Sequence, residues 1–223
     1  MAKIKFGMMM TDASGKLGGQ VFSKNRGGSY VRTKVTPSNA RTSAQMAVRG
    51  AFASVSSAWS GLSEDQRKSF NGFVSSYGKT DIFGDLRNPS GKALFQRLNQ
   101  NLILSNQPNI AVCVSPQEVP FADLVDITVS NAENSMNITT AGDTTGCKLL
   151  VFATNPLSHG TSFVKNKLRI IGVFSGGDSV AFDVADAYNE KFGAFANAMN
   201  IHVGVRVINS NGQASPLEVK KTV

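Results

Sequence analysis

The spacing of hydrophobic and polar positions changes along the chain and divides it into three segments. Residues 20–24 and 29–36 alternate as β-strands do, around a glycine-containing turn at 25–28. Apolar residues then recur every three to four positions, which predicts helices. Short β-branched runs follow after residue 110. We therefore expect an α+β protein with a basic extended arm or β-ribbon (1–41), a helical domain (42–106) and a β-sandwich (110–223).

The N-terminal ribbon has few apolar residues. Residues 1–14 are predicted to form an extended arm or an edge strand. In the second strand of the ribbon, Tyr30, Arg32 and Lys34 fall on one face, because side chains alternate along a strand. A two-stranded ribbon is marginal in water. We expect it to pack against the rest of this chain or against another molecule.

Three helices are predicted in the second segment. Thr42 and Ser63 each stand three positions before a glutamine, which is the spacing of a capping box. The first helix carries one continuous apolar stripe that includes Trp59. The second extends to residue 78, and a third helix follows a ten-residue loop, 79–88. Helices of this length with short links should pack as a small bundle.

The third segment reads as a β-sandwich of about seven strands, similar in spacing to immunoglobulin-like domains. One stretch, residues 186–199, is helix-like, and we interpret it as a helical insertion or as a loop with a single helical turn. Six strands are predicted directly, at 124–130, 135–140, 148–154, 168–174, 179–184 and 201–208.

The positive charge is concentrated at the N-terminus. The chain has a net charge of +8, and residues 1–50 alone carry nine lysines and arginines against one aspartate. Such asymmetry indicates an arm that lies on something acidic, either a protein neighbour or nucleic acid. The candidate contact residues are Lys24, Arg26, Tyr30, Arg32, Lys34 and Arg41.

No pattern of catalytic residues is present, and we expect no enzyme activity, no cofactor and no metal. The pairs Gly15-Lys16 and Gly91-Lys92 lack the Ser/Thr that follows the lysine of a phosphate-binding loop. The two histidines, His159 and His202, have no acid or nucleophile beside them in the sequence. Cys113 and Cys147 are predicted to be buried reduced thiols, with a bridge between neighbouring strands as the alternative.

Targeting signals are also lacking. The apolar stretch at the N-terminus is too short for a signal peptide, and no apolar run reaches the roughly 18 residues of a membrane span. We therefore expect no membrane association.

Several motifs resemble those of a family of tailed-bacteriophage virion structural proteins. They are the string FSKNRGGSYVR at 22–32, VTPSN at 35–39, Thr42 with Gln45, and Trp59 with Leu62 and Gln66-Arg67. The family has an S-x-N-R-G-G-x-Y-V-R ribbon, an N-P-x-T-x-x-Q helix start and a W-x-x-L-[ST]-x-x-Q-R helix junction. Ala40 stands where the family usually has proline. The resemblance covers about residues 15–105, and the last hairpin of the chain looks like that of fibronectin type III or immunoglobulin-like domains.

The resemblance implies a structural protein of the virion, made in the bacterial cytoplasm. The first expectation is an auxiliary or decoration protein that docks on the capsid through its N-terminal arm. A head–tail junction or tail component, and a packaged non-specific nucleic-acid-binding protein, are the alternatives. The expected partners are the major capsid protein or other virion proteins, a second copy of the chain, and nucleic acid in weak contact.

Overall fold

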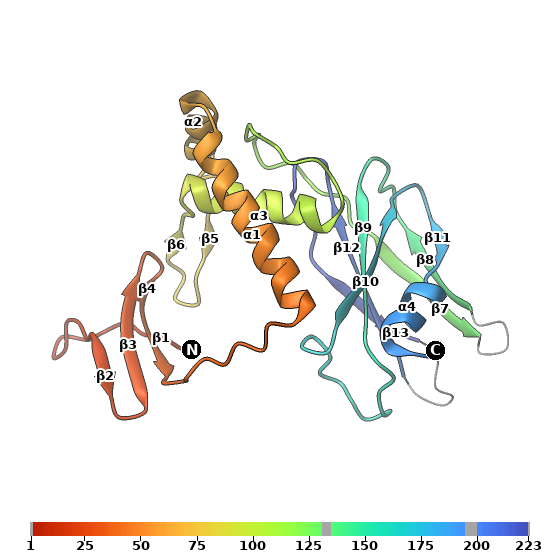
Figure 1. The fold of residues 1–223 in the computed structure, drawn as a ribbon, viewed down its shortest axis with the longest axis horizontal. Helices are drawn as coiled ribbons and strands as arrows, with labels where there is room; N and C mark the ends of the chain where they lie inside the picture. Colours follow the sequence, from red (N-terminus) through yellow and green to blue (C-terminus); the bar gives the residue numbers. More distant parts are fainter. Residues whose placement is uncertain (1, 131–134, 195–199, 223) are drawn as a thin grey trace. The chain divides into compact units, whose positions relative to one another are not determined.

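The computed structural model describes residues 2–130, 135–194 and 200–222 (Figure 1). The chain folds into two compact units. The first comprises Met1–Val48 with Lys79–Arg87, and the second comprises Arg49–Gly78 with Asn88–Val223. Within the described residues there are four helices and four antiparallel sheets, so the fold is α+β. The predicted helical segment 42–106 contributes to both units, which differs from the three-part division expected from the sequence.

The first unit is built on a four-stranded sheet with the order β1-β4-β3-β2. Its strands are β1 (Ala2–Lys3), β2 (Gly15–Leu17), β3 (Gln20–Asn25) and β4 (Gly28–Thr33). The two predicted strands are β3 and β4, and the segment before them adds a strand at each edge. No apolar side chain among the described residues of this unit is buried.

A hairpin far along the sequence completes the first unit. The segment expected to be a plain loop contains two short paired strands, β5 (Lys79–Thr80) and β6 (Leu86–Arg87). Asp81 and Asp85 hold their turn, since Asp81 N–H donates to Asp85 O at 2.9 Å and the Asp81 carboxylate accepts the Asp85 N–H at 3.2 Å. The loop prediction was wrong because these strands are too short to leave an alternating pattern.

Three helices follow the first sheet along the chain: α1 (Ser43–Gly61), α2 (Glu64–Gly72) and α3 (Gly91–Leu104). The capping box of Ser63 and Gln66 is present at the start of α2. α2 is shorter than predicted, because it ends at its C-cap residue Phe73 rather than at residue 78.

The junction between α1 and α2 explains the tryptophan-to-arginine motif. Arg67 donates from Nε to Trp59 O at 3.3 Å and from its guanidinium NH2 to Ser60 O at 2.6 Å. The last carbonyl groups of a helix have no partner within it. Arg67 therefore supplies a partner for Ser60 O and a second partner for Trp59 O, which also accepts the Leu62 N–H at 3.4 Å.

The helices share a small aromatic core. Phe70 and Phe95 are buried, and Trp59 packs against them with ring centroids 6.0 and 5.4 Å away. Val55 of α1 is also buried here, but Phe52, on the same predicted stripe, is 52% exposed. The apolar stripe of α1 is thus buried only in its C-terminal part.

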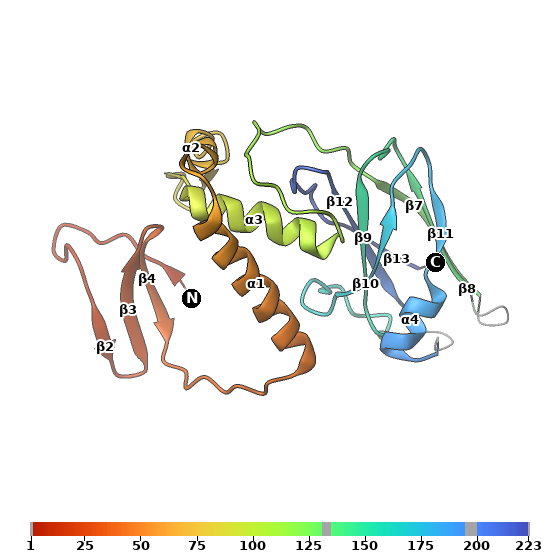
Figure 2. The ribbon, with the colours of Figure 1, turned by 45° about the horizontal axis from the view of Figure 1, so that its top comes forward.

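Seven strands follow, drawn green to blue in Figure 2. The strands of one sheet lie in the order β11-β8-β7, and those of the other in the order β10-β9-β12-β13. Residues of both sheets share one hydrophobic core, which includes Ile127, Ile138, Val151 and Val205. The strands are β7 (Asp123–Ser130), β8 (Ser135–Ala141), β9 (Lys148–Ala153), β10 (Arg169–Ser175), β11 (Ala181–Asp183), β12 (His202–Ile208) and β13 (Glu218–Lys221).

One short helix, α4 (Ala185–Phe192), lies between β11 and β12. It confirms the start of the predicted helical stretch 186–199, but Gly193 is its C-cap and residues 195–199 lie outside the described part. Tyr188 anchors α4 in the core, where it is fully buried and donates from its hydroxyl to Thr154 O at 3.1 Å.

The loop between β12 and β13 joins the helices to the sheets within the second unit. Gly212 has φ of +75°, and a β-carbon there would lie 2.4 Å from Leu98 O. Asn101 of α3 donates to Gly212 O at 2.8 Å, and Gln213 donates to the Tyr77 hydroxyl at 2.7 Å. The backbone of this loop therefore packs directly on α3.

Both cysteines are free, as the first interpretation predicted; Cys113 is buried and Cys147 is half-buried. No helix in the described part of the chain is long and apolar enough to cross a bilayer.

Candidate interaction surface

The sheet of the first unit has two chemically different faces. In antiparallel strands, residues directly opposite one another project from the same side of the sheet. The register places Lys16 opposite Val21 and Val21 opposite Arg32. Lys3, Lys16, Val21, Ser23, Tyr30 and Arg32 form the side that we call the basic face. Ala2, Leu17, Phe22 and Val31 lie on the opposite, apolar face.

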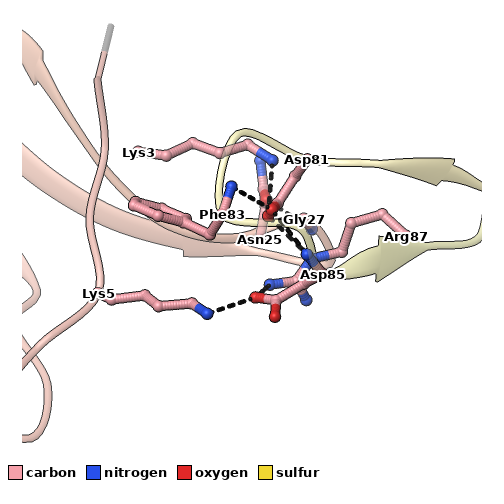
Figure 3. Close-up of polar contacts among 8 residues, drawn as sticks. All are labelled: Lys3, Lys5, Asn25, Gly27, Asp81, Phe83, Asp85 and Arg87. Atoms are coloured by element: carbon pink, nitrogen blue, oxygen red, sulfur yellow. Dashed lines mark hydrogen bonds and ion pairs between the residues drawn. The ribbon is translucent and has the colours of Figure 1, made fainter.

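The hairpin β5–β6, whose turn carries Asp81 and Asp85, contacts Lys3 at one end of the basic face (Figure 3). Asp81, whose side chain is only 3% exposed, accepts Lys3 Nζ at 3.3 Å and Arg87 Nε at 3.4 Å through Oδ2. Its Oδ1 accepts the backbone N–H of Phe83 at 2.8 Å. One carboxylate thus holds its own turn together and also binds the N-terminal strand.

Hydrogen bonding stabilises the charged form of this carboxylate. Burial by itself raises the pKa of Asp81. The hydrogen bonds from the Phe83 and Asp85 N–H groups, Lys3 and Arg87 outweigh that effect and lower the pKa from 3.8 to about 2. Asp81 is therefore ionised over the whole physiological pH range.

A second set of contacts surrounds Asp85. Lys5 Nζ lies 2.9 Å from Asp85 Oδ2, and it also lies over the ring of Phe83 at 5.3 Å from the centroid. The Arg87 guanidinium reaches Asp85 Oδ2 at 3.4 Å. It also covers Gly28, where a β-carbon would lie 3.3 Å from the guanidinium NH2. The hairpin therefore covers the end of the face at the β3–β4 turn.

A cleft of about 380 Å³ lies between the N-terminal strand, this turn and the hairpin. Its cations already hold carboxylates of the same unit. The pairs are Lys3 and Arg87 with Asp81, Lys5 and Arg87 with Asp85, and Lys24 with Asp12. The cleft therefore offers little uncompensated charge for an anionic ligand.

The six predicted contact residues lie in different surroundings. Arg26, Arg32 and Lys34 are exposed, and none has an ion-pair partner in the described ranges. Lys24 instead pairs with Asp12 at 3.4 Å. It lies opposite Ser29, on the apolar side of the sheet.

The other two predicted residues are not equivalent either. Tyr30 is half-buried on the basic face, directly opposite Lys3 and Ser23. Arg41 is exposed in the connection that leads to α1 and has a positive φ of 48°. The structure brings Tyr30 and Arg32 together on one face, and it does not bring Arg41 or Lys24 to that face.

Sequence reasoning missed the partners of the lysines. Asp81 and Asp85 are 78 and 80 positions from Lys3 and Lys5, so no local spacing connects them. The sequence does indicate a turn that carries two carboxylates, because DIFGD has aspartates on both sides of Ile-Phe-Gly. Lys16 is one of the basic residues of the ribbon but was not among the six predicted contact residues, and the register places it in line with Arg32.

The features tested for chemistry have structural roles or none. Gly91 is the first residue of α3, and a β-carbon there would lie 2.1 Å from Asn71 Oδ1, so the position is packed rather than open to a phosphate. His159 is exposed in a loop, and His202 is buried in β12. Among the residues described, no three His, Cys, Asp or Glu side chains form a metal-binding group.

Comparison with known proteins gives no relative for this chain: no family model, no curated protein and no solved structure matches it.

Proposed function

We propose that this protein is a structural component of a bacteriophage virion, an auxiliary or decoration protein that docks on the capsid through the first unit. One observation carries the proposal. The carboxylates Asp12, Asp81 and Asp85 neutralise the lysines at one end of the sheet, while Arg26, Arg32 and Lys34 have no ion-pair partner among the described residues. Such cations are suited to an acidic surface on a neighbour.

The strand order of the second unit supports a further part of this proposal, an immunoglobulin- or fibronectin-like sandwich. In constant-type immunoglobulin domains the first, second, fourth and fifth strands share one sheet, and the third, sixth and seventh share the other. Here β7, β8 and β11 form one sheet, and β9, β12 and β13 lie in the other; the fourth strand, β10, departs from the constant-type order because it pairs with β9. A sandwich of this kind implies no activity by itself. It suits a module displayed on, or packed between, other subunits.

The motif resemblance extends the proposal from docking to the virion, since the ribbon and helix-junction motifs resemble those of phage structural proteins. A head–tail junction or tail component would use the same chemistry at another position in the particle.

A packaged nucleic-acid-binding protein is the second candidate function. It is favoured by the half-buried Tyr30 beside the unpaired Arg32, because an aromatic ring next to a cation can stack a base and bind its phosphate. This function predicts binding that weakens steeply with salt.

Co-sedimentation with DNA-free capsid shells of the source phage tests the proposal. We expect saturable binding that survives moderate salt, and loss of binding when residues 1–36 are deleted. The second unit has two cores of its own, so the truncated protein should remain folded. Full binding by the truncated protein would contradict docking through the first unit. Binding to duplex DNA but not to shells would favour the second candidate. Binding to neither would favour a component of the tail or of its junction with the head.

A further inference from the structure

We infer that Lys16, Arg32 and Lys34 form a docking site for an acidic loop or hairpin of a neighbouring protein. The inference rests on the proposed function and names the part of the first unit that makes the contact. All three side chains are exposed, and none makes an ion pair with any residue that the structure describes.

The three cations lie in register at one end of the basic face. Lys16 and Arg32 are on opposite sides of Val21, so two strand spacings put their backbones about 10 Å apart. The Lys34 N–H donates to Gly19 O at 2.8 Å, which continues the β3–β4 ladder by one residue. Lys34 therefore falls on the same side as Arg32, about 7 Å along the strand.

The other end of the same face already binds a ligand of this kind. The hairpin β5–β6 presents Asp81 and Asp85 to Lys3 and Lys5, and the hairpin is part of the same unit. The protein thus contains one example of carboxylates on a short hairpin bound by cations of this face (Figure 3). The cations at the open end offer the same chemistry to a second acidic segment.

A protein segment fits this site better than nucleic acid does. Binding to single strands relies on successive aromatic platforms along a basic groove. In the part of the sheet that the structure describes, the basic face has one aromatic side chain, Tyr30, and it is half-buried. Three cations whose backbones lie within about 12 Å of one another instead match two or three carboxylates on one loop.

A charge-removal variant tests the inference in the full-length protein. The variant carries Lys16→Gln, Arg32→Gln and Lys34→Gln. The matched control carries Lys92→Gln, Lys165→Gln and Arg169→Gln, which removes the same charge from exposed positions of the second unit. Both variants and the wild-type protein are sedimented with DNA-free capsid shells, and each is also titrated with a single-stranded oligothymidine. Circular dichroism of the whole chain reports whether each protein is folded, because Trp59 lies in the core of the second unit and the three cations lie in the first.

We expect the charge-removal variant to bind shells on the order of tenfold more weakly, since each exposed ion pair contributes modestly, and the control to bind as wild type does. Equal shell binding by both variants would overturn this inference and leave the proposed function standing. Wild-type protein that does not bind shells would overturn the proposed function itself. Loss of oligothymidine binding with unchanged shell binding would also overturn the inference, because the site would then serve nucleic acid.

Discussion

Replacing Gly212 by alanine should separate the β12–β13 loop from α3. A β-carbon at this position would lie 2.4 Å from Leu98 O, 2.8 Å from Leu98 C and 3.0 Å from Leu98 Cα. All three are backbone atoms, which cannot move aside as the end of a flexible side chain can. The loop must therefore shift, and the hydrogen bond from Asn101 Nδ2 to Gly212 O, 2.8 Å long, would be lost.

The cost has two parts. The positive φ of +75° costs a residue with a β-carbon about 1–2 kcal/mol. The lost hydrogen bond and loosened packing add about 1–2 kcal/mol, so the free energy of unfolding should fall by about 2–4 kcal/mol. Gly146 provides a matched control, because its φ is +76° and a β-carbon there would meet nothing within 4 Å. Gly146→Ala should cost only the backbone part, about 1–2 kcal/mol.

Urea unfolding followed by fluorescence measures both variants. Trp59 is the single tryptophan of the chain, and it lies in the helical core beside Phe70 and Phe95. The midpoint should fall further for Gly212→Ala than for Gly146→Ala, with the slope unchanged. Equal losses for the two variants would refute the packing of the loop on α3, since the shared backbone cost would then explain both.

Two further predictions concern titratable groups. Asp81→Asn should free the hairpin β5–β6 from Lys3, and the backbone amide of residue 83 should exchange with solvent faster. Because the pKa of Asp81 is lowered to about 2, the wild-type contact is fully formed above about pH 4 and should be lost as the pH falls toward 2. Burial, followed by the charge of Lys221, lowers the pKa of His202 below 6.5. The unfolded chain then binds a proton that the folded chain does not, so the free energy of unfolding should decrease as the pH drops below about 6.5. The decrease should be smaller in His202→Gln. Equal pH dependence of the two proteins in urea unfolding would contradict this.

The sequence alone determined the features whose causes are local. The capping box of Ser63 and Gln66 involves residues three positions apart, and both of its hydrogen bonds are made within the first turn of α2. The turn between β3 and β4 follows from Asn25 and the glycines after it, since the Asn25 side chain accepts the Gly27 N–H at 2.8 Å. The alternation of β8 and β12 was also sufficient to locate them, because most of their inward residues are apolar.

Sequence reasoning was less successful where stability depends on distant residues. β13 has the sequence EVKK, which carries no apolar alternation, and it is a strand because it pairs with β12. The stripe on α1 predicted a buried helix along its length, but only Val55 is buried, since Phe70 and Phe95 cover only the end near Trp59. Helical periodicity identifies the apolar side of a helix but not how much of it finds a partner.

The same distinction holds for the candidate interaction surface. The sequence by itself determined that the first fifty residues are strongly basic and that Arg32 and Lys34 share one side of a strand. Only the tertiary structure decided which cations are neutralised, because the carboxylates of Asp81 and Asp85 come from a hairpin nearly eighty residues away. The net charge of a segment follows from its composition, whereas its ion pairs depend on where folding places the charged side chains. A carboxylate lowers the energy of a lysine only when folding brings the two within a few ångströms.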